Sequence, residues 1–302
     1  MIHVSAVQAP AHIQDTGRYG HRRYGIGHAG AMDTVALAAG NILLGNDEGT
    51  AAIEIALGGI MLVFERDTPF CLTGAVYQAE LDGEPVYSYW RYTARKGQTL
   101  KLVRAVQGMG GFDVPEVMGS RSTDLKAGFG GHQGRMLQKG DCLSIGKGAQ
   151  ELSKVGIAPI PFTDTVHLVP SSEYAAFSEK GRLNLERETW TLQSDSNRMG
   201  YRFDGQPLTL SQPLEMLSHA VQAGTVQVPP GGKPIILLAD AQTTGGYPKI
   251  ATVAAADLGR LAQVRFGSKV KFKIIGLKEA TALRRKNQAY LNQIRRITHE
   301  AG

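Results

Sequence analysis

The chain alternates short apolar runs with Gly-rich turns. Runs of apolar and β-branched residues that end at Gly or Asp-Gly are typical of short β-strands. Gly58 and Gly59 interrupt one such run, which predicts a bent strand or a hairpin there. The expected strands cover residues 2–7, 52–64, 70–72, 76–81, 99–103, 165–169 and 190–193, followed by an apolar run at 234–239 and another at 250–256. This pattern predicts a mainly β protein.

Helical patterns are few and lie between these runs. Asp33 is a suitable N-cap for a helix that runs to about Leu44, with Gly45 at its end. A second, short helix is expected after the Ser pair at 171–172, ending at Phe177. The predicted fold class is therefore mainly β with a few helices (α+β).

The C-terminal segment carries most of the net charge. The chain has a net charge of +6, and residues 278–302 hold six Lys or Arg against two Glu, which is +4. This segment predicts an amphipathic helix with a solvated basic face, which needs no polyanionic partner. Its expected apolar stripe consists of Ala280, Leu283, Tyr290, Leu291, Ile294 and Ile297. The chain has no recognisable nucleic-acid-binding module, so we expect no nucleic-acid partner.

Length and composition favour a protein of the cytoplasm. The 302 residues are enough for two domains, and the 37 glycines favour many tight turns. Apolar runs stay well short of the ~18–20 residues that cross a bilayer, and the N-terminus lacks the pattern of a signal peptide, so we expect no membrane partner. Cys71 and Cys142 have neither metal-site spacing nor the density of a disulfide scaffold.

An internal repeat suggests how the chain is divided. Three motifs recur in the same order: Arg-x-Gly-aromatic-Arg, a Thr-Gly pair after an apolar run, and a basic strand pattern. The pairs are 18–22 with 198–202, 73–74 with 244–245, and 95–102 with 265–272. We therefore expect two copies of one β-rich domain, at 1–147 and 160–302. Residues 104–146 would be an insertion in the first copy, and 146–161 read as a linker.

The stretch 238–249 is the strongest candidate for chemistry. Its apolar run leads into Asp240, Gln242, Thr243 and Thr244, and Gly-Gly and Tyr-Pro turns follow. The first copy has Phe70, Cys71 and Leu72 at the corresponding place, which favours the second copy as the chemical half. Functional groups concentrate on loops held by rigid strands. The alternative is a hairpin whose Thr and Gln side chains satisfy their own turn.

Several common motifs are absent. The Gly-rich stretch 140–147 has one residue too many for a phosphate-binding loop, and Gly148 follows where a hydroxyl is needed. The chain has no dinucleotide-binding Gly motif, no His-Glu-x-x-His or paired Cys-x-x-Cys, no Met-Lys-Met around a biotinylated lysine and no nucleophile elbow. We therefore expect no metal site and no biotin attached to this chain.

The remaining candidates are Arg, His, Asp and amide residues around Gly-rich turns. Arg18 and Arg198 each lie in such a loop, where a guanidinium either binds a carboxylate in bidentate fashion or braces the loop. His28 and His219 follow the two loops and are either structural or catalytic. Asp240 is the strongest candidate, because packing does not explain a carboxylate at the end of a buried strand.

Five ordered motifs carry a resemblance to a known family. They are Gln-Asp-x-Gly-Arg at 14–18, Gly-Ala-Met-Asp at 30–33, Gly-Ser-x-Ser-Thr-Asp-Leu at 119–125, Ser-Asn-Arg-Met-Gly-Tyr-Arg at 196–202 and the stretch 240–249. The chain resembles the biotin-dependent carboxyltransferase family, which includes allophanate hydrolase subunit 2 and KipA-like proteins. The likeness is greatest to its 5-oxoprolinase C subunits. The segment 106–115 is several residues shorter than the corresponding segment of the family pattern. This difference puts in question whether one strand of the first domain forms as it does in the family.

This resemblance implies a fold, partners and an activity. The implied fold is a pair of tandem cyclophilin-like β-barrel domains. The implied partners are the other two subunits of 5-oxoprolinase, the KipI-like B subunit together with the A subunit. The implied reaction is the ATP-dependent hydrolysis of 5-oxo-L-proline, a small-molecule substrate, to L-glutamate. There are two alternatives. One is a urea- or allophanate-type carboxyltransferase subunit, and the other is a regulatory protein that sequesters a KipI-like kinase inhibitor.

Residue types and clustering suggest roles for that reaction. We expect Arg198 to hold the substrate carboxylate and Asp240 to act as base or to orient an amide. The expected donors to the developing oxyanion are Gln242, Thr243 and Thr244. The other expected substrate-binding residues are Asn197, Tyr201, Tyr247 and Arg18. If the chain is an enzyme subunit, polar substitutions at Asp240 should destroy turnover and preserve assembly. If it is a regulatory protein, no such effect on turnover is expected.

Overall fold

The computed structural model describes residues 1–75, 78–103, 107–146 and 152–300. Within these residues the chain is mainly β, with four α-helices, as predicted. It divides into two compact units. Unit 1 consists of Met1–Tyr19, Ala29–Ile160 and Gln288–Gly302, and unit 2 consists of Gly20–His28 and Pro161–Asn287. The expected ranges 1–147 and 160–302 therefore differ from the units at 20–28, at the C-terminus and at the expected linker, which unit 1 includes as far as Ile160.

Some expectations fall on residues that are not described. Residues 147–151 of the expected linker lie outside the described residues, as do 76 and 77 of the strand expected at 76–81. Residues 104–106 at the start of the expected insertion are also outside them. The described remainder of that insertion adds β10 (Gln107–Gly110) and β11 (Cys142–Leu143) to two different sheets of unit 1.

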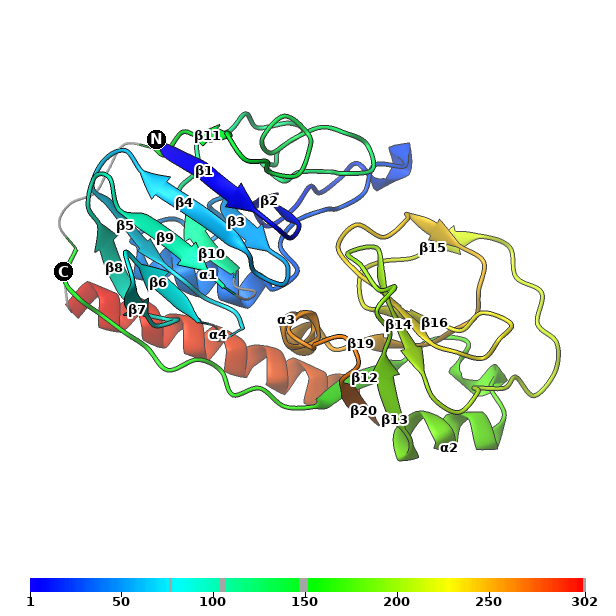
Figure 1. Ribbon diagram of the computed structural model, residues 1–302. Helices are drawn as coiled ribbons and strands as arrows, with labels where there is room; N and C mark the ends of the chain where they lie inside the picture. The colour runs from blue at the N-terminus through cyan, green and yellow to red at the C-terminus, as the bar shows by residue number, and fades with distance from the viewer. Residues whose placement is uncertain (76–77, 104–106, 147–151, 301–302) are drawn as a thin grey trace. The chain divides into compact units, whose positions relative to one another are not determined.

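The described residues of unit 1 form three separate sheets (Figure 1). The largest has the order β11, β1 (Ile2–Val7), β4 (Ile60–Phe64), β9 (Thr99–Leu102), β6 (Ala79–Leu81), β7 (Glu84–Val86). The second has the order β10, β3 (Ala52–Ile55), β2 (Ala11–Gln14), and the third pairs β5 (Thr68–Cys71) with β8 (Arg91–Ala94). Because β3 and β4 belong to different sheets, the run at 52–64 does not form a hairpin.

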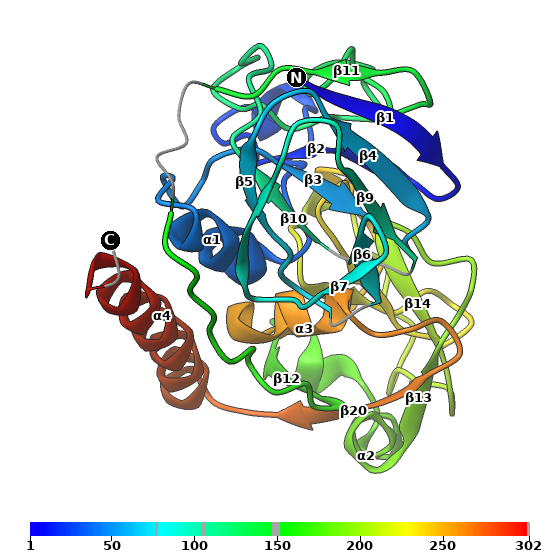
Figure 2. The same cartoon turned by 60° about the vertical axis from the view of Figure 1, so that its left-hand side comes forward.

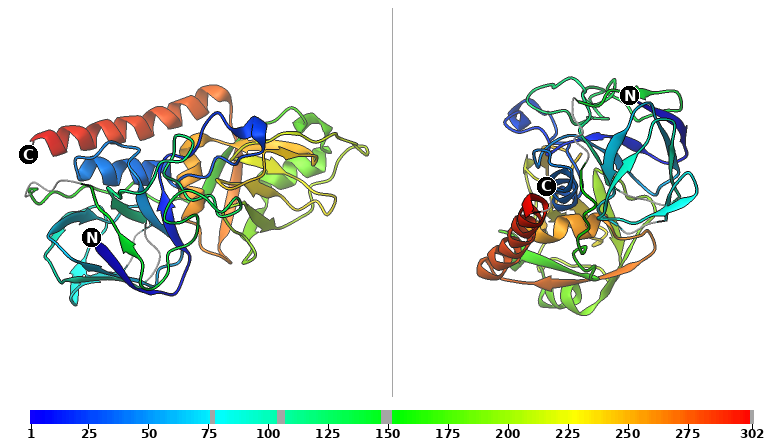
Figure 3. Two further views of the ribbon diagram at one scale, coloured as in Figure 1. Left: turned by 90° about the horizontal axis from the view of Figure 1, so that it is seen from above. Right: turned by 90° about the vertical axis from the view of Figure 1, so that its left-hand side faces the viewer.

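Helix α1 (Thr34–Leu43) starts and ends where its sequence predicts. The Asp33 carboxylate accepts the Ala36 N–H at 2.9 Å, and Gly45 follows the helix with a φ of +72°. Its apolar side chains form a cluster with Leu291 and Ile294 of α4 (Leu277–Glu300). Figures 2 and 3 show the C-terminal half of α4 running beside α1. The predicted amphipathic C-terminal helix is thus present, with most of its basic residues exposed.

Unit 2 is built on a closed seven-stranded barrel (Figure 1). The order is β12 (Thr165–Pro170), β19 (Lys249–Val253), β16 (Thr225–Gln227), β17 (Ile235–Leu237), β14 (Gly200–Asp204), β13 (Thr189–Leu192), β20 (Lys269–Ile274). The barrel closes through a parallel pairing of β20 with β12. Trp190, Phe203 and Phe272 are buried and pack together, with Phe272 5.9 Å from Trp190 and 5.3 Å from Phe203 between ring centroids.

Besides the first part of α4, unit 2 has elements that are not strands of this barrel. They are the 3-10 helices η1 (Arg22–Tyr24), η2 (Tyr174–Ala176) and η3 (Ala255–Asp257), the helices α2 (Glu179–Arg187) and α3 (Leu258–Ala262), and a ribbon of β15 (His219–Ala220) and β18 (Thr244–Gly245). The helix expected after 171–172 is only the single turn η2, which no side chain caps. The full helix α2 begins further on, where the Ser178 hydroxyl accepts the Gly181 N–H at 3.0 Å.

The two units pair their corresponding strands differently. Strand β9 lies antiparallel between β4 and β6, whereas β20 lies parallel to β12 and antiparallel to β13. Unit 2 forms a closed barrel, and the described strands of unit 1 pair in open sheets. These differences do not support superposition of the two halves, which stays a prediction.

Candidate active site

The centre of the candidate site is an ion pair between Asp240 and Arg198 in unit 2. Arg198 donates from Nε to Asp240 Oδ2 at 2.8 Å and from Nη2 to Oδ1 at 2.9 Å. The Asp240 N–H also donates to the Arg198 carbonyl at 3.0 Å. The side chains of Arg198 and Asp240 are only 14% and 11% exposed, respectively. Backbone and side-chain bonds together hold the two groups in one bidentate geometry.

This ion pair changes the expected roles of both residues. The guanidinium edge that was expected to bind a substrate carboxylate already holds Asp240. The orientation of Asp240 is in turn fixed by Arg198, which lies 42 residues earlier in the chain. The pair lies just after β17, and Asp240 holds the Arg198 guanidinium in one orientation.

The expected donors lie on the turn that follows Asp240. Gln242 and Thr243 are half-buried, and Thr244 is exposed. The Thr243 carbonyl accepts the Val221 N–H at 3.1 Å, and Arg22 of η1 bonds to the Val221 carbonyl. Thr244 and Gly245 form β18, which pairs with β15. The backbone of this turn is therefore held by the ribbon and by η1, so its side chains project from a fixed frame.

A second charged group lies at the end of the same stretch. Lys249 Nζ is 2.8 Å from Glu173 Oε2, and the same carboxylate accepts the Lys249 N–H at 3.1 Å. Lys249 Nζ also contacts His219 Nε2. Partial burial acts to raise the pKa of Glu173, but hydrogen bonds from Lys249 and Ser172 outweigh it and hold this pKa below its ordinary value.

Lys249 and Glu173 were not among the expected site residues. Lys249 ends the family motif at 240–249, so its position in the sequence was a usable signal. Glu173 lies 76 residues earlier with no motif around it, and only the fold brings the two together.

The other expected substrate-binding residues of unit 2 make contacts of their own. Asn197 is exposed, and its Oδ1 accepts the Met199 N–H at 2.8 Å within its own turn. Tyr201 is buried, and its hydroxyl donates to the Ala262 carbonyl at the end of α3, 3.4 Å away. Tyr247 is 47% exposed on the loop after β18.

Comparison with known proteins places this fold in a family. The sequence profile of the carboxyltransferase domain, subdomains A and B, matches residues 24–274. The chain belongs to this carboxyltransferase family. It is 58% identical over 307 residues to the 5-oxoprolinase C subunit of Haemophilus influenzae, covering 99% of both chains. It is also 30% identical over 306 residues to a putative urea carboxylase of Emericella nidulans, covering 89% of this chain and 24% of that protein.

A solved structure shares the fold. The crystal structure of the Kluyveromyces lactis urea carboxylase matches 97% of this chain and 29% of that one, with a TM-score of 0.88 at 23% identity. The carboxyltransferase fold expected from the motifs is thereby confirmed.

Arg18 has a different environment in this carboxyltransferase domain. It is 1% exposed in unit 1, donates to the carbonyls of Val117 and Ser122 at 3.0 Å each, and lies 4.6 Å over the Phe129 ring. Desolvation lowers its pKa, and Asp124 and Asp15 oppose this shift. These contacts favour the structural alternative for Arg18.

Asp15 joins two of the family motifs in unit 1. Its Oδ1 accepts the hydroxyls of Ser120 and Ser122 at 2.7 and 2.6 Å and the Gly17 N–H at 2.8 Å, and Oδ2 accepts the Arg121 N–H. The motif at 14–18 and the motif at 119–125 therefore hold each other in place.

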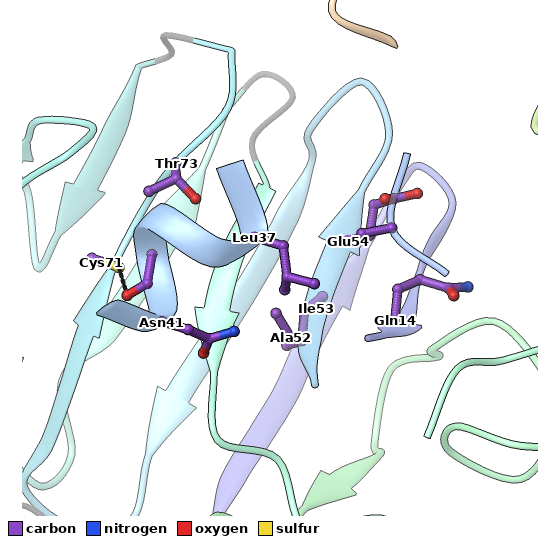
Figure 4. A pocket seen from close by; sticks show the side chains of 10 residues that line it. Gln14, Leu37, Asn41, Ala52, Ile53, Glu54, Cys71 and Thr73 are labelled. Carbon is purple, nitrogen blue, oxygen red and sulfur yellow. Dashed lines mark hydrogen bonds between the residues drawn. The ribbon is translucent and has the colours of Figure 1, made fainter. Parts of the chain in front are cut away.

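Unit 1 also contains a small cavity (Figure 4). Ten residues line it, among them Gln14, Asn41, Glu54 and Thr73. Its volume of about 10 Å³ has room for about one water, which is too little for a lactam ring. The Gln14 amide donates to the Thr123 carbonyl and accepts the Gly30 N–H, both at 3.0 Å. This cavity is a packing feature of unit 1.

Two kinds of feature are absent from the described residues. Among residues 1–75, 78–103, 107–146 and 152–300, no group of three or more His, Cys, Asp or Glu side chains is arranged to hold a metal ion. Over the same ranges, no helix combines the length and the apolar character of a transmembrane span.

Proposed function

We propose that this chain is the C subunit of an ATP-dependent 5-oxoprolinase that hydrolyses 5-oxo-L-proline to L-glutamate. The observation that carries the proposal is the 58% identity to a 5-oxoprolinase C subunit over 99% of both chains. The name of that relative also implies a complex of several subunits. We propose two partners, a KipI-like B subunit plus the A subunit, and we propose the cytoplasm, where ATP is supplied, as the location.

The reaction sets clear requirements on the site. Water adds its oxygen to the lactam carbonyl carbon, the ring C–N bond breaks, and the released nitrogen takes a proton. Amide resonance opposes this step, so the carbonyl oxygen must be activated and its developing charge stabilised. We assign donors for this oxygen to Gln242, Thr243 and Thr244, whose turn is held by the ribbon. The Arg198–Asp240 pair, which has no net charge, would supply a fixed dipole beside them.

The two capped helices of the described residues, α1 and α2, offer no cradle for the phosphates of ATP. A phosphate site usually combines a Gly-rich loop with an uncapped helix N-terminus. The N-terminus of α1 is already occupied by the Asp33 carboxylate and that of α2 by the Ser178 hydroxyl. We therefore propose that ATP binds elsewhere in the assembled complex, and we derive no step of this chain through it.

Reconstitution tests this proposal. The chain would be purified alone and together with the A and B subunits from its own organism, and ADP and glutamate would be measured with and without 5-oxoproline. We expect both products from the full complex and neither from the chain alone. Turnover of ATP by the chain alone, or an assembled complex that makes no glutamate, would contradict the proposal.

A urea-type carboxyltransferase subunit is the second candidate. The 30% identity to the putative urea carboxylase favours it, although this chain spans only 24% of that protein. The same reconstituted complex distinguishes the two functions when 5-oxoproline is replaced by urea. Assembly with a KipI-like protein but no turnover of either compound would point to the regulatory alternative.

A further inference from the structure

A buried amide without a partner lies next to the candidate site. Gln227 is the last residue of β16 and is 2% exposed. Its Nε2 has no hydrogen-bond acceptor within the described part of the chain. Buried amide donors nearly always have a partner, and an unpaired one is destabilising. A donor kept in this state requires an explanation.

The amide points to the turn that carries the expected donors. A Cβ atom placed on Gly245 would lie 2.5 Å from Gln227 Nε2, so a larger residue there would displace this amide. Gly245 pairs with His219 across the ribbon of β15 and β18. The Gln227 donor therefore lies directly against the Thr-Gly turn.

Lys249 brings a cation to the same place. Gln227 and Lys249 are paired residues of β16 and β19, so their side chains leave the sheet side by side. His219 Nδ1 lies 2.9 Å from the Leu217 carbonyl and donates to it, which leaves Nε2 as the acceptor for Lys249. Glu173 accepts a second Lys249 N–H. An ammonium has three donors, so one N–H of Lys249 remains for a ligand.

We propose that Gln227 and Lys249 bind the carboxylate of the substrate. This inference rests on the proposed function, in which the substrate is a small lactam with one carboxylate. The Arg198 edge expected for that carboxylate is held by Asp240. By contrast, the Gln227 amide lies against Gly245, and Lys249, its partner across the strands, contacts His219, the residue paired with Gly245. Because Glu173 balances the charge of Lys249, the pair suits a monoanionic carboxylate better than a phosphate.

The kinetic test uses two variants in the reconstituted complex. We expect Gln227→Leu to raise KM for 5-oxoproline about tenfold and Lys249→Met about 10- to 100-fold, because each removes one charge-assisted hydrogen bond. The value of kcat should change little in comparison. With 2-pyrrolidinone, the same lactam without the carboxylate, kcat/KM should be equal for the variants and the unaltered complex. Lys233→Met, which breaks the exposed ion pair with Asp204, is the matched control.

Thermal stability distinguishes a binding role from a structural one. A ligand-binding amide that is unpaired in the free protein is destabilising, so Gln227→Leu should raise Tm by about 2 °C. A structural role for the Gln227 amide predicts a lower Tm instead. An unchanged KM for 5-oxoproline in both variants, or a fall in Tm for Gln227→Leu, would overturn the inference.

Direct binding separates this inference from the proposed function. The side-chain NH2 resonances of Gln227, assigned by their loss in Gln227→Leu, would be followed while 5-oxoproline or 2-pyrrolidinone is added to the full-length chain. We expect a shift with 5-oxoproline alone. If the complex makes no glutamate yet this shift occurs, the proposed function fails and the carboxylate site stands. If the complex makes glutamate but the Gln227 resonances do not shift, the carboxylate site is wrong and the proposed function stands.

Discussion

The two Thr-Gly turns, at 73–74 and 244–245, have the same residues in opposite environments. Thr73 is fully buried in unit 1, and its hydroxyl donates to the Ala36 carbonyl at 2.7 Å. The Gly74 N–H donates to the Tyr89 hydroxyl at 3.0 Å. In unit 2, Thr244 is exposed, and Gly245 makes room for the Gln227 amide.

The approach to each turn explains this difference. Phe70, Cys71 and Leu72 precede the first turn and are at most 1% exposed. The second turn follows Asp240, which is held by Arg198 instead of by apolar packing. One short motif thus serves packing in unit 1 and presents polar groups in unit 2. The arginines repeat the contrast, since Arg18 binds backbone carbonyls and Arg198 binds a carboxylate.

The largest effect should follow from Asp240→Asn in unit 2. Loss of the carboxylate releases Arg198, and removing one preorganised electrostatic group typically costs about 10²–10³ in rate. We expect 5-oxoproline-dependent ATP cleavage by the complex to fall by at least this factor while assembly is preserved, as measured by gel filtration. Asp204→Asn, at an exposed ion pair, is the control and should retain activity. Near-normal turnover of Asp240→Asn would make this ion pair purely structural.

In unit 1 the corresponding change should act on stability. Asp15→Ala leaves two Ser hydroxyls and two backbone N–H groups without their acceptor, which should lower the free energy of unfolding by about 3 kcal/mol. Urea denaturation of the full chain measures this loss. Ser120→Ala, which removes one of these bonds, should cost about 1 kcal/mol. A loss below that of Ser120→Ala would show that the Asp15 network does not brace unit 1.

Matched Thr→Val substitutions compare the turns directly. Thr73→Val removes a buried hydrogen bond and should lower the free energy of unfolding by about 1–2 kcal/mol. Thr244→Val, at an exposed position, should change it by less than about 0.5 kcal/mol and instead reduce turnover. Equal stability losses for the two variants would remove the distinction between packing and chemistry.

The smallest effect concerns the Cys71 thiol beside the first turn. Burial raises its pKa from 9.0 to about 12, against a smaller opposite effect of Arg91. The unfolded thiol ionises first, so the folded state loses stability as pH rises from about 9 toward 12, by at most about 1.4 kcal/mol per pH unit. Cys71→Ala should therefore show a shallower loss than the unaltered chain in urea denaturation between pH 9 and 10. Cys142→Ala, at an exposed thiol, should keep the original slope.

The sequence by itself determined the local features of this protein. Helix α1 follows from Asp33 as its cap and Gly45 beyond its end, because both act within one helical turn. Strand β1 and helix α4 follow from apolar patterns that repeat within a few residues. The motif at 240–249 located the candidate site, since Gly and polar residues after a buried strand are a local signal.

Only the tertiary structure decided which groups meet there. The ion pair of Arg198 with Asp240 and that of Glu173 with Lys249 join residues 42 and 76 positions apart. The Gln227 amide meets Gly245 because the barrel places β16 next to β19, beneath the ribbon of β15 and β18. These contacts depend on strand register and barrel closure, which arise from many distant pairings at once, so no short window of sequence encodes them.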